Sequence, residues 1–189
     1  MAPVKATLAS SNPHKAAELA RVLVGWEIEP LAAEYPEEVG ETFEANALAK
    51  ARFGRTLAPA GHWVLGEDSG IEVAALDGAP GIYSARWAAG DEVGKMLAAM
   101  EGKAERGARY VCALAAIAPD GRELVVRGTL EGRIADALAG SEGFGYDPVF
   151  VPEGGDATAA ELGNTWKAEH SHRARAAREL LRRLDGATS

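Results

Sequence analysis

The chain contains 189 residues, of which 47% are hydrophobic and 25% are charged, so it is long enough for a domain with a buried core. Its formal net charge of -8 argues against a general nucleic-acid-binding protein, because such proteins neutralise phosphates with a surplus of Lys and Arg. The same charge is compatible with a nucleotide substrate, which needs only a local positive pocket.

The sequence has no feature of membrane insertion or secretion. No stretch approaches the roughly 20 apolar residues that a membrane span needs, and the N-terminus lacks the apolar region of a signal peptide. We therefore expect a cytoplasmic protein that binds neither membranes nor nucleic acids. The single cysteine, Cys112, lies in an apolar run and is expected to be a buried, inert thiol.

The first part of the chain predicts a strand, a turn and two helices. An apolar strand over 4–9 is followed by a polar turn and by a helix that begins at Pro13 and ends before Gly25. A second helix is expected over 42–57. Extended segments over 63–65 and 71–73 then flank a short acidic segment that contains Glu67 and Asp68.

The second part of the chain continues the alternation of helices and strands. Turn-forming Gly and Pro residues predict an irregular loop over 76–90, and a helix follows over 91–100. The remaining expected elements are a hairpin of strands over 110–117 and 123–130, a short strand over 148–151, and a helix from Ser171. This order predicts an α/β fold with a mixed sheet, organised as a single domain over 1–189.

The first candidate site is the start of the first helix, where unpaired N–H groups and a partial positive charge can bind an anion. The segment consists of Ser10, Ser11, Asn12, Pro13, His14 and Lys15. The segment is not a Walker A loop, because the glycines of that motif are missing. The alternative is an ordinary capped helix with a solvated lysine.

The second candidate site is acidic. Mg²⁺ prefers hard oxygen ligands and usually takes only one or two protein carboxylates. Asp68 lies between two apolar segments, and Glu37 and Glu38 form a separate acidic cluster, so the two clusters together suit a magnesium ion. The alternative is a solvated acidic loop, which is the commoner explanation for Glu37 and Glu38 taken singly.

The third candidate site combines glycines, aromatic rings and basic side chains. An aromatic ring offers a flat face to a base, and glycines allow a ligand to approach the backbone. The residues are Phe144, Gly145, Tyr146, Asp147, Lys167, His172 and Arg173. The alternative makes the aromatic side chains part of the core and the arginine-rich last helix a solvated face.

Six segments, taken in chain order, resemble the signatures of the inosine triphosphate pyrophosphatase family. They are SSNPHK (10–15), GETFEANA (40–47), EDSG (67–70), GAPGIYSAR (78–86), GFGYDP (143–148) and SHRA (171–174). Any one segment can arise by chance, whereas six in order are specific. The resemblance implies an α/β fold with an elongated mixed β-sheet flanked by helices, two lobes around a central nucleotide cleft, and a homodimer.

The resemblance also implies roles for individual residues. Asp68 matches the catalytic carboxylate and a magnesium ligand, Ser69 matches a substrate contact, and the second magnesium ligand falls at Glu37 or Glu38. The turn over 10–14 with Lys15 and Lys50 matches phosphate-binding positions. Base and nucleotide recognition is implied for Phe144, Gly145, Tyr146, Asp147, Lys167, His172 and Arg173.

The resulting hypothesis is a hydrolase with Mg²⁺ as cofactor, which converts the purine nucleoside triphosphates ITP, dITP and XTP to the monophosphate and pyrophosphate and so cleanses the nucleotide pool. Asp68 orients or deprotonates the attacking water, and the Arg173 guanidinium donates to the 6-oxygen of the base. Two alternatives remain at this point. One is a Maf-like nucleotide pyrophosphatase with another base preference, and the other is a non-catalytic nucleotide-binding or dimerisation module.

Overall fold

The computed structural model describes residues 2–186, which form two compact units. Unit 1 contains the chain up to Asp68, residues 112–128 and the chain from Arg173 onward, and unit 2 contains residues 69–111 and 129–172. One six-stranded sheet has the order β2-β1-β3-β4-β5-β6, with parallel and antiparallel pairs. The predicted α/β class with a mixed sheet is therefore confirmed, whereas a single domain and a two-lobed cleft stay predictions.

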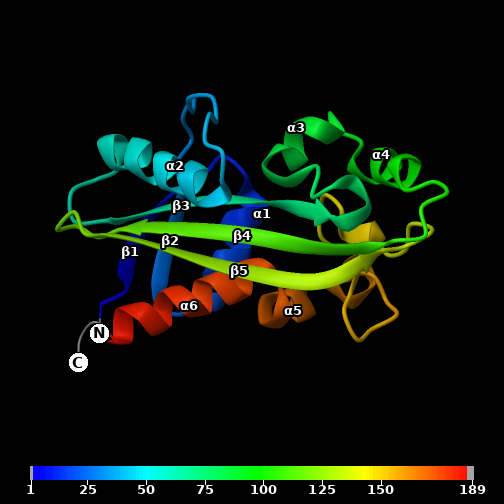
Figure 1. Cartoon of the computed structure of the whole chain (residues 1–189). Coiled ribbons are helices and arrows are strands. Elements are labelled where there is room, and N and C mark those ends of the chain that lie inside the picture. The colour runs from blue at the N-terminus through cyan, green and yellow to red at the C-terminus, as the bar shows by residue number, and fades with distance from the viewer. Residues whose placement is uncertain (1, 187–189) are drawn as a thin grey trace. The chain divides into compact units, whose positions relative to one another are not determined.

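Unit 1 combines helices with strands, and its β1 pairs in parallel with both β2 and β3. Its strands are β1 (Val4–Ala9), β2 (Trp26–Pro30) and parts of β3 (Trp63–Val73), β4 (Gly107–Ile117) and β5 (Glu123–Ile134). Its helices are α1 (Pro13–Val22), α2 (Phe43–Leu57) and α6 (His172–Gly186). Helices α1 and α6 pack on one face of these strands, and α2 covers the other face (Figure 1).

The helices of unit 1 begin where their capping residues predict. The Asn12 side chain accepts a hydrogen bond from the His14 backbone N–H, and the Thr42 side chain accepts one from the Ala45 N–H. In α6, Ala174 and Ala177 are buried, whereas its four arginines after residue 174 are exposed, as the periodicity predicts. Capping therefore places the starts of α1 and α2 correctly, and periodicity places the buried and exposed faces of α6.

A glycine sets the distance between α2 and β3. A Cβ atom added at Gly66 would lie 2.1 Å from the Ala47 carbonyl oxygen and 2.5 Å from the Ala51 backbone nitrogen. Only a residue without a side chain fits there, because both atoms belong to the backbone of α2. This close approach brings the middle turns of α2 onto the part of β3 that immediately precedes Asp68.

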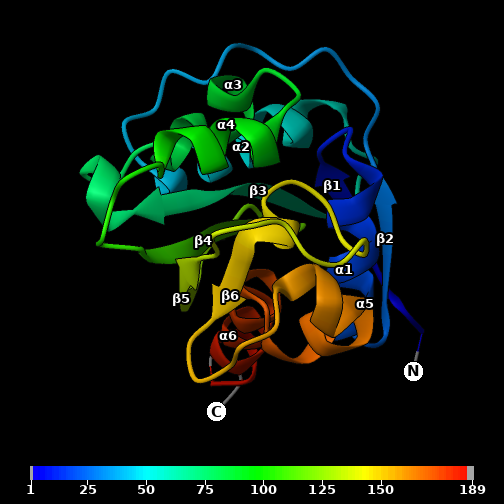
Figure 2. The ribbon, with the colours of Figure 1, turned by 90° about the vertical axis from the view of Figure 1, so that its right-hand side faces the viewer.

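Unit 2 contains the remaining parts of the long strands and four helices or strands of its own. These are β6 (Phe150–Pro152), which is antiparallel to β5, and the helices α3 (Ser84–Ala88), α4 (Glu92–Ala99) and α5 (Ala159–His170). Short 3-10 turns occur at η1 (Ala74–Leu76), η2 (Gly81–Tyr83) and η3 (Asp147–Val149). Helices α3 and α4 lie on one side of the strands of this unit, and α5 lies on the other (Figure 2).

The structure corrects several element boundaries. The two extended segments at 63–65 and 71–73 are one continuous strand, β3, because the acidic residues between them find buried cationic partners. The expected loop over 76–90 contains η2 and α3. Strands β4 and β5 extend beyond the predicted hairpin, and β2 and α5 were not predicted at all. Helix α5 is interrupted at Gly163, whose φ is 82°, which weakens its helical pattern.

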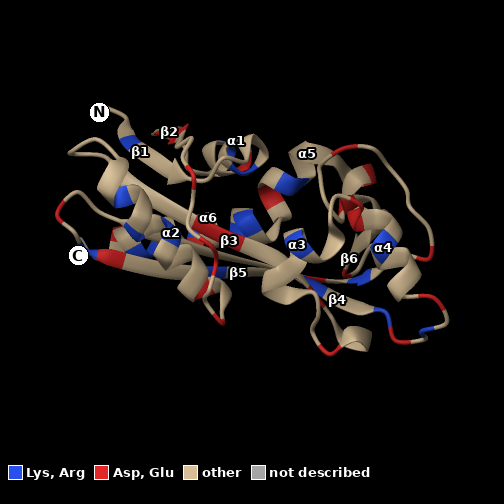
Figure 3. Cartoon of the chain, turned by 90° about the horizontal axis from the view of Figure 1, so that it is seen from above, with Lys and Arg blue, Asp and Glu red and all other residues tan. Residues whose placement is uncertain are grey.

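The placement of charged and apolar residues in the structure agrees with what the composition of the chain predicts. Acidic and basic residues are interspersed along the ribbon of each unit (Figure 3). Between residues 2 and 186, none of the helices combines the length and the hydrophobicity that a membrane crossing requires. Cys112 is fully buried, as predicted, and burial raises the pKa of its thiol well above the ordinary value.

Candidate active site

The candidate site in unit 1 lies at the carboxyl end of β1. Strand β1 is flanked by β2 on one side and by β3 on the other, so the chain reverses direction across the sheet at β1. Ligands bind α/β sheets at such switch points, outside the carboxyl ends of the strands. The last β1–β3 pair joins Ala9 to Gly66, so the turn after Ala9 adjoins Glu67 and Asp68.

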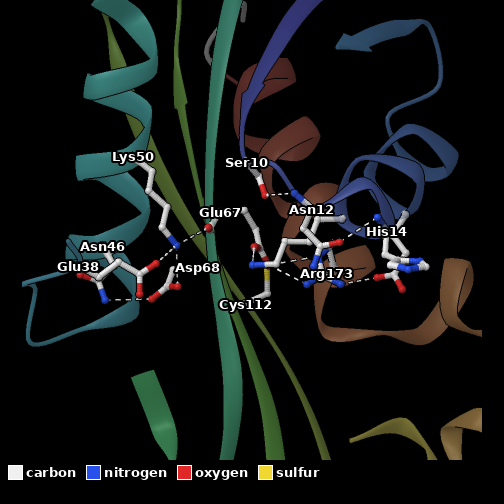
Figure 4. A network of polar contacts seen from close by, with 12 residues as sticks. Ser10, Asn12, His14, Glu38, Asn46, Lys50, Glu67, Asp68, Cys112 and Arg173 are labelled. Carbon is white, nitrogen blue, oxygen red and sulfur yellow. Dashed lines mark hydrogen bonds and ion pairs between the residues drawn. The ribbon is translucent and has the colours of Figure 1, made fainter. Parts of the chain in front are cut away.

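The side chains of consecutive residues of β3 point to opposite faces of the sheet. Side chains alternate along a strand, so Asp68 faces α2 and Glu67 faces α1 and α6. Figure 4 shows the Asp68 carboxylate with Lys50 on one side of the strand and the Glu67 carboxylate with Arg173 on the other. The acidic pair thus organises two separate polar networks.

Asp68 is the centre of the first network. Asp68 is only 4% exposed, and its carboxylate accepts hydrogen bonds from Lys50 Nζ at 2.9 Å and from Asn46 Nδ2 at 3.1 Å. Burial raises the pKa of Asp68 above its usual value of 3.8, although the Lys50 ammonium opposes this shift. A carboxylate with a raised pKa accepts a proton from water more readily than an ordinary aspartate does.

Lys50 joins Asp68 to a second carboxylate. Its ammonium forms ion pairs with Asp68 and Glu38, and it donates to the Glu67 backbone carbonyl at 3.2 Å. Burial by itself lowers the pKa of Lys50, but Asp68 and Glu38 outweigh it, so the net pKa is raised. The ammonium therefore stays charged between the two carboxylates at neutral pH.

The same two carboxylates suit a divalent metal ion. Oxygens of Asp68 and Glu38 both contact the single Lys50 nitrogen, so they converge on one position that already carries positive charge. Hard carboxylate oxygens are the protein ligands that Mg²⁺ takes. Glu38 is partly buried in this network, whereas the neighbouring Glu37 is exposed, so the geometry favours Glu38 of the two predicted ligands.

The turn before α1 presents the predicted phosphate-binding segment. The Ser10 hydroxyl accepts a hydrogen bond from the Asn12 backbone N–H at 3.1 Å, and the Asn12 side chain caps the helix. Ser11, Pro13 and His14 are exposed. Lys15 forms an ion pair with Glu67 at 2.5 Å and keeps 16% of its side chain exposed.

Arg173 occupies the buried side of the second network. Its side chain is 1% exposed, and its Nε and Nη2 donate to Glu67 Oε1 at 3.2 and 2.8 Å, while Nη1 donates to Glu18. Burial acts to lower the pKa of Arg173, but the two carboxylates raise it overall. All three donor positions thus contact carboxylates of unit 1, and the predicted contact of Arg173 with a base stays a prediction.

Unit 2 contains the predicted base-recognition residues other than Arg173, and several of them lie around Asp147. The Asp147 carboxylate accepts hydrogen bonds from Tyr110 Oη at 3.1 Å, from the Phe144 backbone N–H at 2.9 Å and from Lys167 Nζ at 2.6 Å. Both Asp147 and Lys167 have only 4% of their side chains exposed. They therefore form a buried ion pair that holds the loop before η3.

Aromatic rings surround this ion pair. The Lys167 ammonium lies 4.7 Å from the centre of the Phe144 ring, and the His172 ring stacks on Tyr110 at 4.6 Å. Tyr146 is instead buried in the core of unit 2 and donates to the Ser84 carbonyl at 2.6 Å. The structure thus brings Phe144, Lys167 and Asp147 together and gives Tyr146 a packing role.

Glycine conformations shape the loop that carries Phe144. Gly143 has a φ of 82°, and a Cβ atom there would lie 2.1 Å from an Asp147 carboxylate oxygen. Gly145 also has a positive φ, of 64°. Both positions favour glycine, because side chains disfavour this left-handed region.

Ser69, the remaining predicted residue, lies half-buried in β3.

Three residues of these networks were not predicted. Glu18 follows Lys15 by one helical turn, and Asn46 precedes Lys50 by four residues, so both shared a helical face with a predicted residue. That spacing was a usable signal. Tyr110 contacts Asp147 across 37 residues of sequence, and nothing local in the sequence indicates that contact.

Comparison with known proteins decides the family. A model of the Ham1 family matches residues 6–183. The chain belongs to the Ham1 family. Among curated relatives, this Ham1-family chain is 46% identical to a dITP/XTP pyrophosphatase of an Exiguobacterium species, over 94% of this chain and 95% of the relative. It is 45% identical to a dITP/XTP pyrophosphatase of Symbiobacterium thermophilum, over 97% and 96% of the two chains.

Solved structures of Ham1 proteins have the same fold. The Ham1 protein of Staphylococcus aureus superposes with a TM-score of 0.83 at 35% identity, covering 97% of this chain and 99% of the other. A nucleoside-triphosphatase / dITP/XTP pyrophosphatase from Mycobacterium abscessus gives a TM-score of 0.72 at 45% identity, covering 96% and 100%. The family resemblance that six short motifs predict is therefore confirmed over nearly the whole chain.

Proposed function

We propose that this Ham1-family chain is a hydrolase that cleaves dITP, XTP and ITP to the nucleoside monophosphate and pyrophosphate. The observation that carries the proposal is the buried Asp68 carboxylate, which shares the Lys50 ammonium with Glu38 at the carboxyl end of β1. The likeness to dITP/XTP pyrophosphatases over more than nine-tenths of the chain supports this choice of substrate.

Asp68 and Glu38 are the residues that would hold Mg²⁺. Bound there, the ion would supply Lewis-acid polarisation of phosphate oxygens and offset their charge. The identity of the metal is part of the proposal and rests on the hard oxygen donors.

The side chains of unit 1 supply the other parts of the reaction. Asp68 orients the attacking water and accepts its proton, for which its raised pKa is suited. Lys15, Lys50 and the N–H groups at the start of α1 bind the phosphates and stabilise the charge that develops on the leaving pyrophosphate. Catalysis of this kind depends on positioning and on charge stabilisation.

The side chains of unit 2 supply base recognition. Phe144 offers a ring face, and the Lys167–Asp147 pair presents a donor beside an acceptor. Hypoxanthine and xanthine present the complementary pattern, an acceptor 6-oxygen beside a donor N1–H, whereas adenine presents the reverse. Each unsatisfied buried group costs about 1–3 kcal/mol, so this pair favours a 6-oxo purine over adenine by about tenfold to a hundredfold or more.

The test measures pyrophosphate and inorganic phosphate released from dITP, XTP, ITP, GTP and ATP, each with magnesium and with chelator. We expect pyrophosphate from dITP, XTP and ITP in magnesium and none in chelator. Asp68→Asn should lower turnover by about 10²- to 10⁴-fold, because it removes the proton acceptor. Asp120→Asn, at an exposed turn of unit 1, is the matched control and should retain activity.

Two results would refute the proposal. One is release of inorganic phosphate in place of pyrophosphate, which would move the attack away from the α-phosphorus. The other is normal turnover by a folded Asp68→Asn protein.

A further inference from the structure

Glu67 contacts two cations of unit 1 in different ways. Its Oε1 accepts from the buried Arg173 guanidinium, and its Oε2 pairs with the Lys15 ammonium at 2.5 Å. The Glu67 side chain itself is 0% exposed. A fully buried carboxylate of this kind needs cationic partners, because an isolated buried charge is very costly.

The network around Glu67 is electrically balanced. Glu18 and Glu67 carry negative charge, and Lys15 and Arg173 carry positive charge. Arg173 is fully buried and Glu18 nearly so, whereas Lys15 keeps 16% of its side chain exposed. Of these four residues, Lys15 is therefore the one whose charged group is accessible to a ligand.

A lysine side chain is a poor anion receptor when it is free to move. It has four rotatable bonds and about 2 kcal/mol of rotamer entropy, part of which is lost when it binds a phosphate. An ammonium group has three N–H donors, so the ion pair with Glu67 leaves at least two donors for another acceptor. Glu67 can thus fix the position of the ammonium without consuming its capacity to bind phosphate.

From these contacts we infer that Glu67 is a positioning residue, which holds the Lys15 ammonium at the start of α1 in the orientation that binds the triphosphate. The inference rests on the proposed function for the role of Lys15. Arg173 in turn fixes Glu67 from inside the unit. The backbone carbonyl of Glu67 also accepts from Lys50, so this one residue of β3 contacts both lysines (Figure 4 shows the Lys50 contact).

A rival role for Glu67 predicts the opposite result. If Glu67 acted only as a negative charge near the phosphates, its neutralisation would remove repulsion and tighten binding. If it positions Lys15, its neutralisation leaves two cations with a neutral amide between them, and Lys15 loses its anchor. The sign of the change in affinity therefore distinguishes the two roles.

The experiment measures the Kd of inorganic tripolyphosphate in chelator by calorimetry, which requires neither catalysis nor metal. The proteins are the wild type, Glu67→Gln, Lys15→Met and the double variant. We expect Glu67→Gln to weaken binding by about tenfold, within the limit of about thirtyfold set by the rotamer entropy of lysine. In the Lys15→Met background, the same Glu67→Gln change should have no further effect on Kd.

Two controls separate positioning from folding. Glu18→Gln weakens the contacts of Arg173 but leaves the Glu67–Lys15 pair, so it should change Kd much less than Glu67→Gln does. Glu67→Asp keeps the charge that Arg173 requires and is one methylene shorter, so it provides the same test if Glu67→Gln does not fold. With ITP and magnesium, Glu67→Gln should raise KM more than it lowers kcat.

The inference is overturned if Glu67→Gln tightens binding, if the Kd is unchanged, or if the effect is equally large without Lys15. These outcomes are independent of the proposed function. Absence of pyrophosphate release from ITP by the wild type would defeat the proposed function alone, since tripolyphosphate binding would still report on Glu67 and Lys15.

Discussion

Replacing Lys50 by methionine tests the electrostatics of the candidate metal site. Methionine keeps most of the length of the side chain and removes the ammonium that Asp68 and Glu38 share. The Asp68 side chain, which is only 6% exposed, then retains Asn46 as its remaining hydrogen-bond partner in this network. We expect Lys50→Met to destabilise the protein by leaving a buried carboxylate without its cation.

The magnitude follows from the contact that is lost. Lys50 Nζ donates to Asp68 Oδ1 at 2.9 Å, and a hydrogen bond to a charged group contributes about 1.5–3 kcal/mol. Glu38 is more exposed and water replaces its partner, so it adds little. For a chain of this length each kcal/mol changes the Tm by about 2–4 °C, so the expected decrease is about 3–12 °C.

The loss should depend on pH with a defined sign. Burial raises the folded-state pKa of Asp68 above 3.8 even with Lys50 present, and removing Lys50 raises it further. A group whose folded pKa is raised contributes stability that is complete below its unfolded pKa and is lost as pH rises through its folded pKa. The free-energy deficit of Lys50→Met should therefore be larger at about pH 8 than at about pH 4.5.

Urea denaturation of the metal-free protein at the two pH values measures this deficit. Lys5→Met replaces an exposed lysine of β1 and should change stability by no more than about 0.5 kcal/mol at either pH. A deficit for Lys50→Met that is equal at both pH values, or that is larger in acid, would contradict this account of Asp68.

Three further substitutions test the packing of α2 and the buried ion pair of unit 2. Gly66→Ala should lower the free energy of unfolding by about 1–3 kcal/mol, measured by thermal unfolding, because the new Cβ would lie 2.1 Å from the Ala47 carbonyl oxygen. Gly186→Ala is the control, because a Cβ atom there would have no heavy atom within 4 Å. Equal losses of stability in the two variants would disprove the close approach of α2. Lys167→Met and Asp147→Asn should each lower the free energy of unfolding by about 3–5 kcal/mol, because each leaves a buried charge without its partner. In urea denaturation, the double variant should lose clearly less than the sum of the two single losses. Additive losses would show that the two groups are not coupled.

Local chemistry in the sequence was sufficient for the first helices and for the family. Asn12 and Thr42 cap their helices because their side chains accept from N–H groups two or three residues away, an interaction that short sequence windows contain. The six motifs likewise identified the family, since their order along the chain is itself sequence information.

Long-range contacts decided what local patterns did not contain. Glu67 and Asp68 were expected to interrupt a strand, and β3 continues through them because Arg173, Lys15 and Lys50 balance their charges from other elements. Arg173 donates to carboxylates 106 and 155 residues away, contacts that no local pattern indicates, and its contact with a base stays a prediction. The free energy of a buried charge depends on partners brought together only by folding, so the sequence by itself determined the family and the fold class, and the tertiary structure determined which side chains balance each buried charge.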